Sequence, residues 1–132
     1  MNTKILMSLT ALLMGTLGLI ASFMPREILS QLGSTPNSPN AIWIQVGGAA
    51  YLGFAMLNWT ARTNPIGGIY GRPVALGNFI HFAVAALALL KAVIGGSSRT
   101  YGVLVGAFAY SAFAVWYGLV LFTHLVTRKP VD

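Results

Sequence analysis

Four long, almost uninterrupted apolar runs are the feature that most constrains the fold of this chain. They cover residues 5–24, 41–59, 73–94 and 101–126. A helix of about twenty residues is about 30 Å long, which matches the hydrocarbon core of a bilayer. The runs are apolar on every side and do not alternate with period two, so they do not resemble the strands of a barrel. The predicted fold is an all-α membrane protein, an antiparallel four-helix transmembrane bundle that forms a single domain over residues 1–132.

Charge and cysteine content support the same class and exclude others. Only 8% of the 132 residues are charged, whereas about 25% is usual in soluble domains. The net charge is +6, but the basic residues stand at the ends of the apolar runs. There they anchor helices and meet lipid headgroups, and they form no patch that tracks nucleic-acid phosphates. The chain has no cysteine, which excludes disulfides and thiolate chemistry.

The first run also has the outline of a secretory signal peptide, because Lys4 precedes an apolar stretch. Its length exceeds the about 7–15 residues of a signal-peptide core, so we expect a retained span. Pro25 follows this run, and residues 25–32 are expected to form a short helix at the membrane interface.

Basic residues between the runs predict the orientation. An even number of spans places both termini and the middle loop on one side of the membrane. That side carries five basic residues, and the other carries two: Lys4, Arg62, Arg72, Arg128 and Lys129 against Arg26 and Arg99. The positive-inside rule therefore predicts that both termini are cytoplasmic.

Small residues recur at helical spacing in three of the runs. The first run carries a stripe of five, the second a dense group of five, and the fourth a GxxxG pair: Ser8, Ala11, Gly15, Gly18 and Ser22; Gly47, Gly48, Ala49, Ala50 and Gly53; Gly102 and Gly106. Such stripes let helix backbones approach closely. They predict packing within the bundle, or contact with protein partners or with further copies of the chain.

Polar side chains gather at the predicted cytoplasmic ends of the second and third runs. The candidate ligand-binding residues are Asn58, Asn78, His81, Arg62, Tyr70, Arg72 and Tyr117, with His124 as a further neighbour. Tyr110, Tyr117 and His124 recur every seven residues, so they are expected to share one face of the fourth run. Ionisable groups at membrane depth usually face a partner or a cavity. Two interpretations follow: His81 fastens helices through the asparagines, or the cluster binds a ligand, quinone or proton.

The sequence gives little support for a catalytic site or a cofactor site. The two histidines have no carboxylate beside them, whereas a stable metal site needs three or four ligands. A haem between His81 and His124 is disfavoured by their different depths. Residues 67–72 read Gly-Gly-Ile-Tyr-Gly-Arg and lack the lysine and hydroxyl of a phosphate-binding loop. We predict no metal, no cofactor and no catalytic residue, and an enzyme that uses His81 as a base is the least favoured option.

Residues 51–59 and 67–82 carry a resemblance to known sequences. They read Tyr-Leu-Gly-Phe-Ala-Met-Leu-Asn-Trp and Gly-Gly-Ile-Tyr-Gly-Arg-Pro-Val-Ala-Leu-Gly-Asn-Phe-Ile-His-Phe. This pattern resembles small four-helix bacterial membrane proteins and, more loosely, the DoxX-like group. The resemblance implies a multi-pass protein of the bacterial cytoplasmic (inner) membrane. DoxX-like proteins are often linked with oxidoreductase or quinone systems, but this chain has no redox motif of its own, so we carry over the architecture and not an activity.

These observations favour a non-enzymatic accessory subunit or small binding module of a membrane assembly. The alternative is a carrier of a small molecule or lipid, or an oligomeric channel, that uses the polar cluster.

Overall fold

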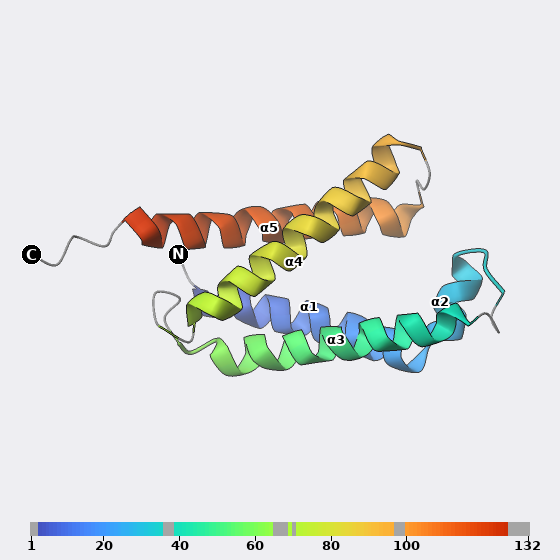
Figure 1. Cartoon of the computed structure of the whole chain (residues 1–132), viewed down its shortest axis with the longest axis horizontal. Helices are drawn as coiled ribbons and strands as arrows, with labels where there is room; N and C mark the ends of the chain where they lie inside the picture. The colour runs from blue at the N-terminus through green and yellow to red at the C-terminus, as the bar shows by residue number, and fades with distance from the viewer. Residues whose placement is uncertain (1–2, 36–38, 65–68, 70, 97–99, 127–132) are drawn as a thin grey trace, which may run out of the picture. The chain divides into compact units, whose positions relative to one another are not determined.

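The computed structural model describes residues 3–35, 39–64, 69, 71–96 and 100–126, with side chains to residue 123. Within these ranges all regular structure is helical: α1 (Thr3–Phe23), α2 (Pro25–Gln31), α3 (Asn40–Ala61), α4 (Gly71–Ile94) and α5 (Tyr101–Val126) (Figure 1). Four of these helices, all except α2, are long and apolar enough to cross a membrane. The prediction of an all-α chain is confirmed, and the four predicted spans coincide with these four long apolar helices.

The predicted spans begin and end within two residues of the observed helices. Pro25 occupies the first turn of α2, where its fixed φ suits a helix and its missing N–H has no intrahelical partner. The short helix predicted after the first span is therefore confirmed. Pro25 and Leu29 are buried in α2, whereas Leu32, which follows the helix, is exposed. The chain leaves α2 through Gly33, whose φ of 72° is strained for residues with a Cβ.

The chain falls into two compact units, which we describe separately. The first comprises Lys4–Thr63 and holds α1, α2 and α3. The second comprises Met1–Thr3 with Asn64–Asp132 and holds α4 and α5.

In the first unit α1 and α3 run antiparallel with their backbones in close contact. A Cβ placed on Gly18 would lie 2.9 Å from the backbone nitrogen of Leu52 and 3.0 Å from the carbonyl oxygen of Gly48. One turn further along α1, the carbonyl of Ser22 accepts a hydrogen bond of 3.3 Å from Gln45. The stripe of small residues in the first span thus packs against α3, as its spacing predicts.

In the second unit α4 and α5 also run antiparallel, but aromatic side chains fill the contact. Phe82 of α4 stacks on Phe113 of α5, with ring centroids 4.9 Å apart and an interplanar angle of 16°. Phe79 meets Phe122 edge to face at 6.0 Å. Figure 1 shows these two helices crossing at an angle.

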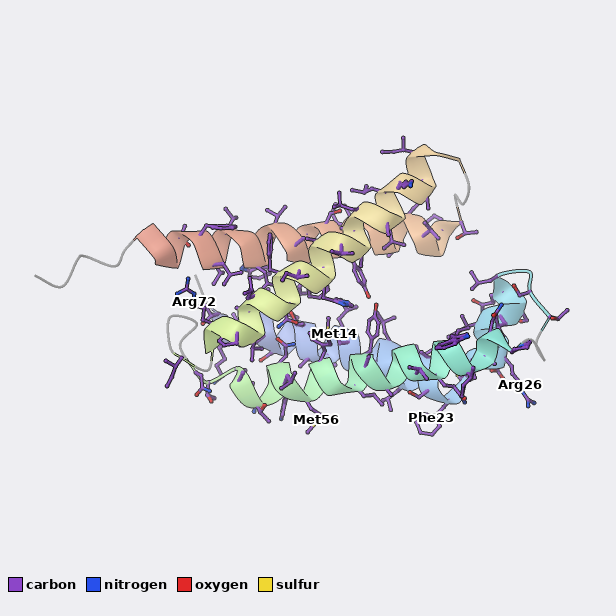
Figure 2. The ribbon with its side chains drawn as sticks, in the orientation of Figure 1. Met14, Phe23, Arg26, Met56 and Arg72 are labelled. Carbon is purple, nitrogen blue, oxygen red and sulfur yellow. The ribbon has the colours of Figure 1, made fainter. Side chains whose placement is uncertain are left out.

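Large apolar side chains cover the exposed surface of every long helix. Trp43 is 71% exposed, Leu12 69% and Phe108 78%, and Figure 2 shows Phe23 and Met56 on the outside of the α1·α3 pair. Water-soluble proteins rarely expose apolar patches beyond a few hundred Å². The exposed surface therefore suits lipid, in agreement with a multi-pass membrane protein.

Candidate functional site

The residues of the predicted polar cluster divide between the two units. In the first unit Asn58 of α3 is fully buried, and its side-chain amide donates a 2.9 Å hydrogen bond to the carbonyl of Phe54. Arg62 follows the last turn of α3. Its guanidinium lies 3.4 Å from the centroid of the Trp59 ring and donates a 2.8 Å hydrogen bond to the Trp59 carbonyl. This cation–π contact fixes a positive charge at the end of the span.

In the second unit Asn78 repeats the arrangement of Asn58. It is fully buried in α4, and its amide donates a 2.8 Å hydrogen bond to the carbonyl of Val74, one turn earlier. Bonding to the carbonyl four residues back keeps part of a polar side chain satisfied by its own helix. Asn78 shares the buried face of α4 with Ala75, Phe82 and Ala86.

An aromatic cluster surrounds Phe82 at the centre of the α4·α5 contact. Tyr117 and Phe113 lie nearly parallel to the Phe82 ring, and Tyr110 meets it at 70° with centroids 5.2 Å apart. Tyr117 is fully buried. The sequence interpretation placed Tyr110 and Tyr117 on one face of their helix, which is confirmed, but it missed Phe82 and Phe113 as the centre of the cluster.

His81 lies at the edge of this cluster. Its ring is 5.4 Å from Phe82 and 5.9 Å from Tyr110, measured between centroids. Two buried polar atoms of this unit, His81 Nε2 and Ser111 Oγ, make no hydrogen bond within the described part of the chain. Ring contacts to its own helix and to α5 help to hold the imidazole in place.

The remaining predicted residues are Arg72, Tyr70 and His124. Arg72 is exposed at the start of α4 and is labelled in Figure 2. Tyr70 and the side chain of His124 lie outside the described residues. The structure therefore brings His81 and Tyr117 into the aromatic cluster of the second unit, with Asn78 one turn away on α4. It holds Asn58 and Arg62 in the first unit.

A groove between α1 and α3 was not anticipated from the sequence. It has a volume of about 540 Å³ and is lined by Lys4, Ile5, Ser8, Leu9, Leu12 and Trp59. A second hollow of about 310 Å³ adjoins it, because Leu12 and Trp59 line both; its other residues are Ala11, Ala55 and Met56. The only sequence signal for this groove is Trp59 at the end of the second run, with Arg62 one turn later.

The small residues of α3 divide between two faces of the helix. Gly48 faces α1, where a Cβ would lie 2.7 Å from the backbone nitrogen of Ser22. Ala49, Ala50 and Gly53 are exposed, and a Cβ on Gly53 would meet no atom within 4 Å. At about 100° per residue, this second face points away from α1.

The described residues contain no group of three or more histidine, cysteine or carboxylate side chains that could hold a metal ion. Comparison of the chain with protein-family models, curated proteins and solved structures finds no match. The function must therefore be argued from the two packed pairs, the groove and the exposed face of α3.

Proposed function

We propose that this protein is a non-enzymatic accessory subunit, or small binding module, of a larger membrane assembly, and that α3 contacts a transmembrane helix of the partner. The observation that carries this proposal is the exposed small-residue face of α3, defined by Ala49, Ala50 and Gly53. Lipid provides no hydrophobic force between helices, so association depends on close packing and interhelical hydrogen bonds. An alanine or glycine surface allows that close approach, whereas a leucine surface would hold a partner further away.

The rest of α3 supports this assignment. Its opposite face already packs on α1 through Gly48, so the exposed small residues are not required for that contact. Ala49 and Gly53 are four residues apart, which is the small-xxx-small spacing of many helix–helix interfaces in membranes. Val46 and Leu57 are exposed on the same side and would flank a docked helix.

We propose that the protein forms a four-helix bundle in the bacterial cytoplasmic (inner) membrane and that both of its termini are cytoplasmic. The positive-inside count supports the orientation, and the resemblance to the DoxX-like group supports the membrane assigned. Because the chain has no cysteine, single cysteines report the orientation directly. Thr63→Cys should react only after the membrane is permeabilised, whereas Ser34→Cys should react with an impermeant maleimide in intact cells. The opposite pattern would invert the orientation.

Affinity purification from native membranes tests the proposed function. Ala49→Leu should abolish co-purification of a stoichiometric partner, because the larger side chain prevents the close approach. Ala112→Leu is the matched control: the same change at an exposed alanine of α5, which should leave the partner bound. A wild-type protein that runs alone or only with copies of itself would contradict the proposal, and so would equal loss in the two variants.

A carrier of a small molecule is the second proposal, and the observation that favours it is the complete burial of the Asn58 and Asn78 amides. Buried amides at membrane depth are costly unless they serve packing or a ligand. Native mass spectrometry of wild-type protein should then show a bound small molecule that is lost in Asn58→Leu or Asn78→Leu. Wild-type protein without adduct would exclude this alternative.

A further inference from the structure

We infer that the groove between α1 and α3 is a binding site for an anionic phospholipid, with its acyl chain along the groove and its phosphate at Lys4 and Arg62. This site lies on a different surface from the exposed face of α3 and does not depend on the proposed function. The shape of the groove, its apolar lining and the charges at one end support this assignment.

The shape of the groove suits a single extended chain. Its lining extends along α1 from Lys4 to Leu12, about 12 Å at 1.5 Å per residue. The adjoining hollow continues the groove toward the middle of the helices, and the buried residues Ala11 and Ala55 help to line it. Both of these residues are small, and the exposed residues Leu12 and Met56 also line this hollow.

The lining is apolar except at one end. Ile5, Leu9, Leu12 and Trp59 supply hydrocarbon or ring surface, and Ser8 is the only hydroxyl. Lys4 lies at the N-terminal end of α1 and is exposed. An apolar trough that begins beside an ammonium group matches a lipid, which joins hydrocarbon to a charged headgroup.

Arg62 adds a second positive charge at this end. Its guanidinium is held 3.4 Å from the centroid of Trp59, whose ring lines the groove. The hydrogen bond to the Trp59 carbonyl fixes its position further. No carboxylate lines the groove; the acidic residue described in this unit, Glu27, lies in α2, beyond the opposite end of α1.

These charges select an anionic over a zwitterionic headgroup. A basic residue near an anionic membrane surface contributes about 1 kcal/mol, or about a fivefold enrichment. Tryptophan favours the headgroup level of the membrane, which places Trp59 where the glycerol backbone of the lipid would lie. The occupant we assign is therefore a phosphatidylglycerol-type lipid from the leaflet that borders this end of the unit.

The test uses Trp59 as a local reporter. The full-length variant Trp43→Phe/Trp116→Phe retains Trp59 as its only tryptophan and is placed in phosphatidylcholine vesicles. These vesicles contain a small fraction of either brominated phosphatidylglycerol or brominated phosphatidylcholine, since bromine quenches tryptophan on contact. With Lys4 and Arg62 each contributing about fivefold, the anionic lipid should quench Trp59 with about thirtyfold higher apparent affinity. Adding Lys4→Gln/Arg62→Gln should remove this preference.

Two matched controls distinguish a specific lipid site from general attraction between the basic protein and anionic lipid. Arg26→Gln removes one positive charge of the same unit, in α2, and should leave the preference unchanged. A variant with Trp43 as its only tryptophan reports the opposite end of α3 and should show no preference. Equal quenching by both lipids at Trp59, a preference that survives loss of Lys4 and Arg62, or one that Arg26→Gln abolishes would each overturn the inference.

One further arm distinguishes a lipid from a free phosphate. Glycerol phosphate at millimolar concentration should not relieve quenching by the brominated lipid, because the acyl chain supplies much of the binding. Relief at equal ionic strength, with sodium chloride as the reference, would show that the groove binds a headgroup alone and would contradict the assignment.

Discussion

The two helix pairs of this protein pack in opposite ways, one through close approach of the backbones and the other through large aromatic side chains. Between α1 and α3, glycines bring the backbones together, and a Cβ on Gly48 would lie 2.9 Å from the carbonyl oxygen of Gly18. Between α4 and α5, stacked rings around Phe82 fill the space. Neither pair gains a hydrophobic force in lipid, so each depends on the quality of its contacts. We expect the first pair to be damaged by added atoms and the second by removed atoms.

Removal of the central ring should have the largest effect. Phe82→Ala loses contacts with Tyr110, Phe113 and Tyr117, and core Phe-to-Ala changes in soluble proteins cost about 3–5 kcal/mol. In a membrane the separated helices remain in lipid, so the substitution loses mainly the packing contacts of the ring and little of its transfer free energy from water. We therefore expect the free energy of unfolding to decrease by about 3 kcal/mol. Equilibrium unfolding in mixed micelles measures it.

The control for this prediction is Phe108→Ala, the same change at a residue of α5 that is 78% exposed. It should alter the free energy of unfolding by less than about 0.5 kcal/mol. Similar losses in the two variants would show that the aromatic cluster does not determine the stability of the second unit.

Addition of one methyl group at the α1·α3 contact should have the next largest effect. Gly48→Ala places a Cβ 2.7 Å from the backbone nitrogen of Ser22, and a backbone cannot rotate away as a side chain can. The helices must separate, for which we expect a cost of about 2 kcal/mol. Gly47→Ala is the neighbouring control. A Cβ there meets no atom within 4 Å, so it should be neutral or stabilise by up to about 1 kcal/mol.

The contrast between Gly47 and Gly48 also shows what the sequence could and could not predict. Apolar length predicted four spans, and the stripe that contains Gly18 predicted close helix packing. In the second span, however, small residues occupy consecutive positions from 47 to 50 and therefore point in several directions. Periodicity cannot say which of these faces α1, because the answer depends on how α1 is rotated.

The candidate site was predictable to a similar degree. The spacing of Tyr110 and Tyr117 placed both on one face, and Asn78 was expected at membrane depth. The ring that both tyrosines contact was not predictable, since Phe82 stands among many apolar residues with no distinguishing pattern. The groove beside Trp59 and the hollow that adjoins it are lined by residues of both α1 and α3, and only the pairing of these two helices brings those residues together.

Substitution of His81 should have a moderate effect that separates a packing role from a chemical one. His81→Ala removes ring contacts with Phe82 and Tyr110, and each aromatic pair contributes about 0.5–1.5 kcal/mol. We expect a loss of about 1 kcal/mol in the unfolding assay. His81→Phe keeps a ring at this position and should restore most of that loss. Failure of phenylalanine to restore stability would assign His81 a role that depends on its nitrogens.

The smallest effect should come from adding a methyl group in the aromatic unit, which completes the comparison. A Cβ on Gly118 would lie 3.2 Å from Cε2 of Phe79, and one on Gly106 would lie 3.5 Å from Cδ1 of Leu89. Both neighbours are the ends of side chains, so they can shift where the backbone beside Gly48 cannot. The gain in helix propensity from glycine to alanine, about 1 kcal/mol, then offsets much of the strain.

We expect Gly118→Ala to change the free energy of unfolding by less than about 1 kcal/mol and Gly106→Ala to be neutral or stabilising. If Gly118→Ala instead cost as much as Gly48→Ala, the two pairs would be equally intolerant of added volume, and the difference between backbone and ring packing would not govern their stability.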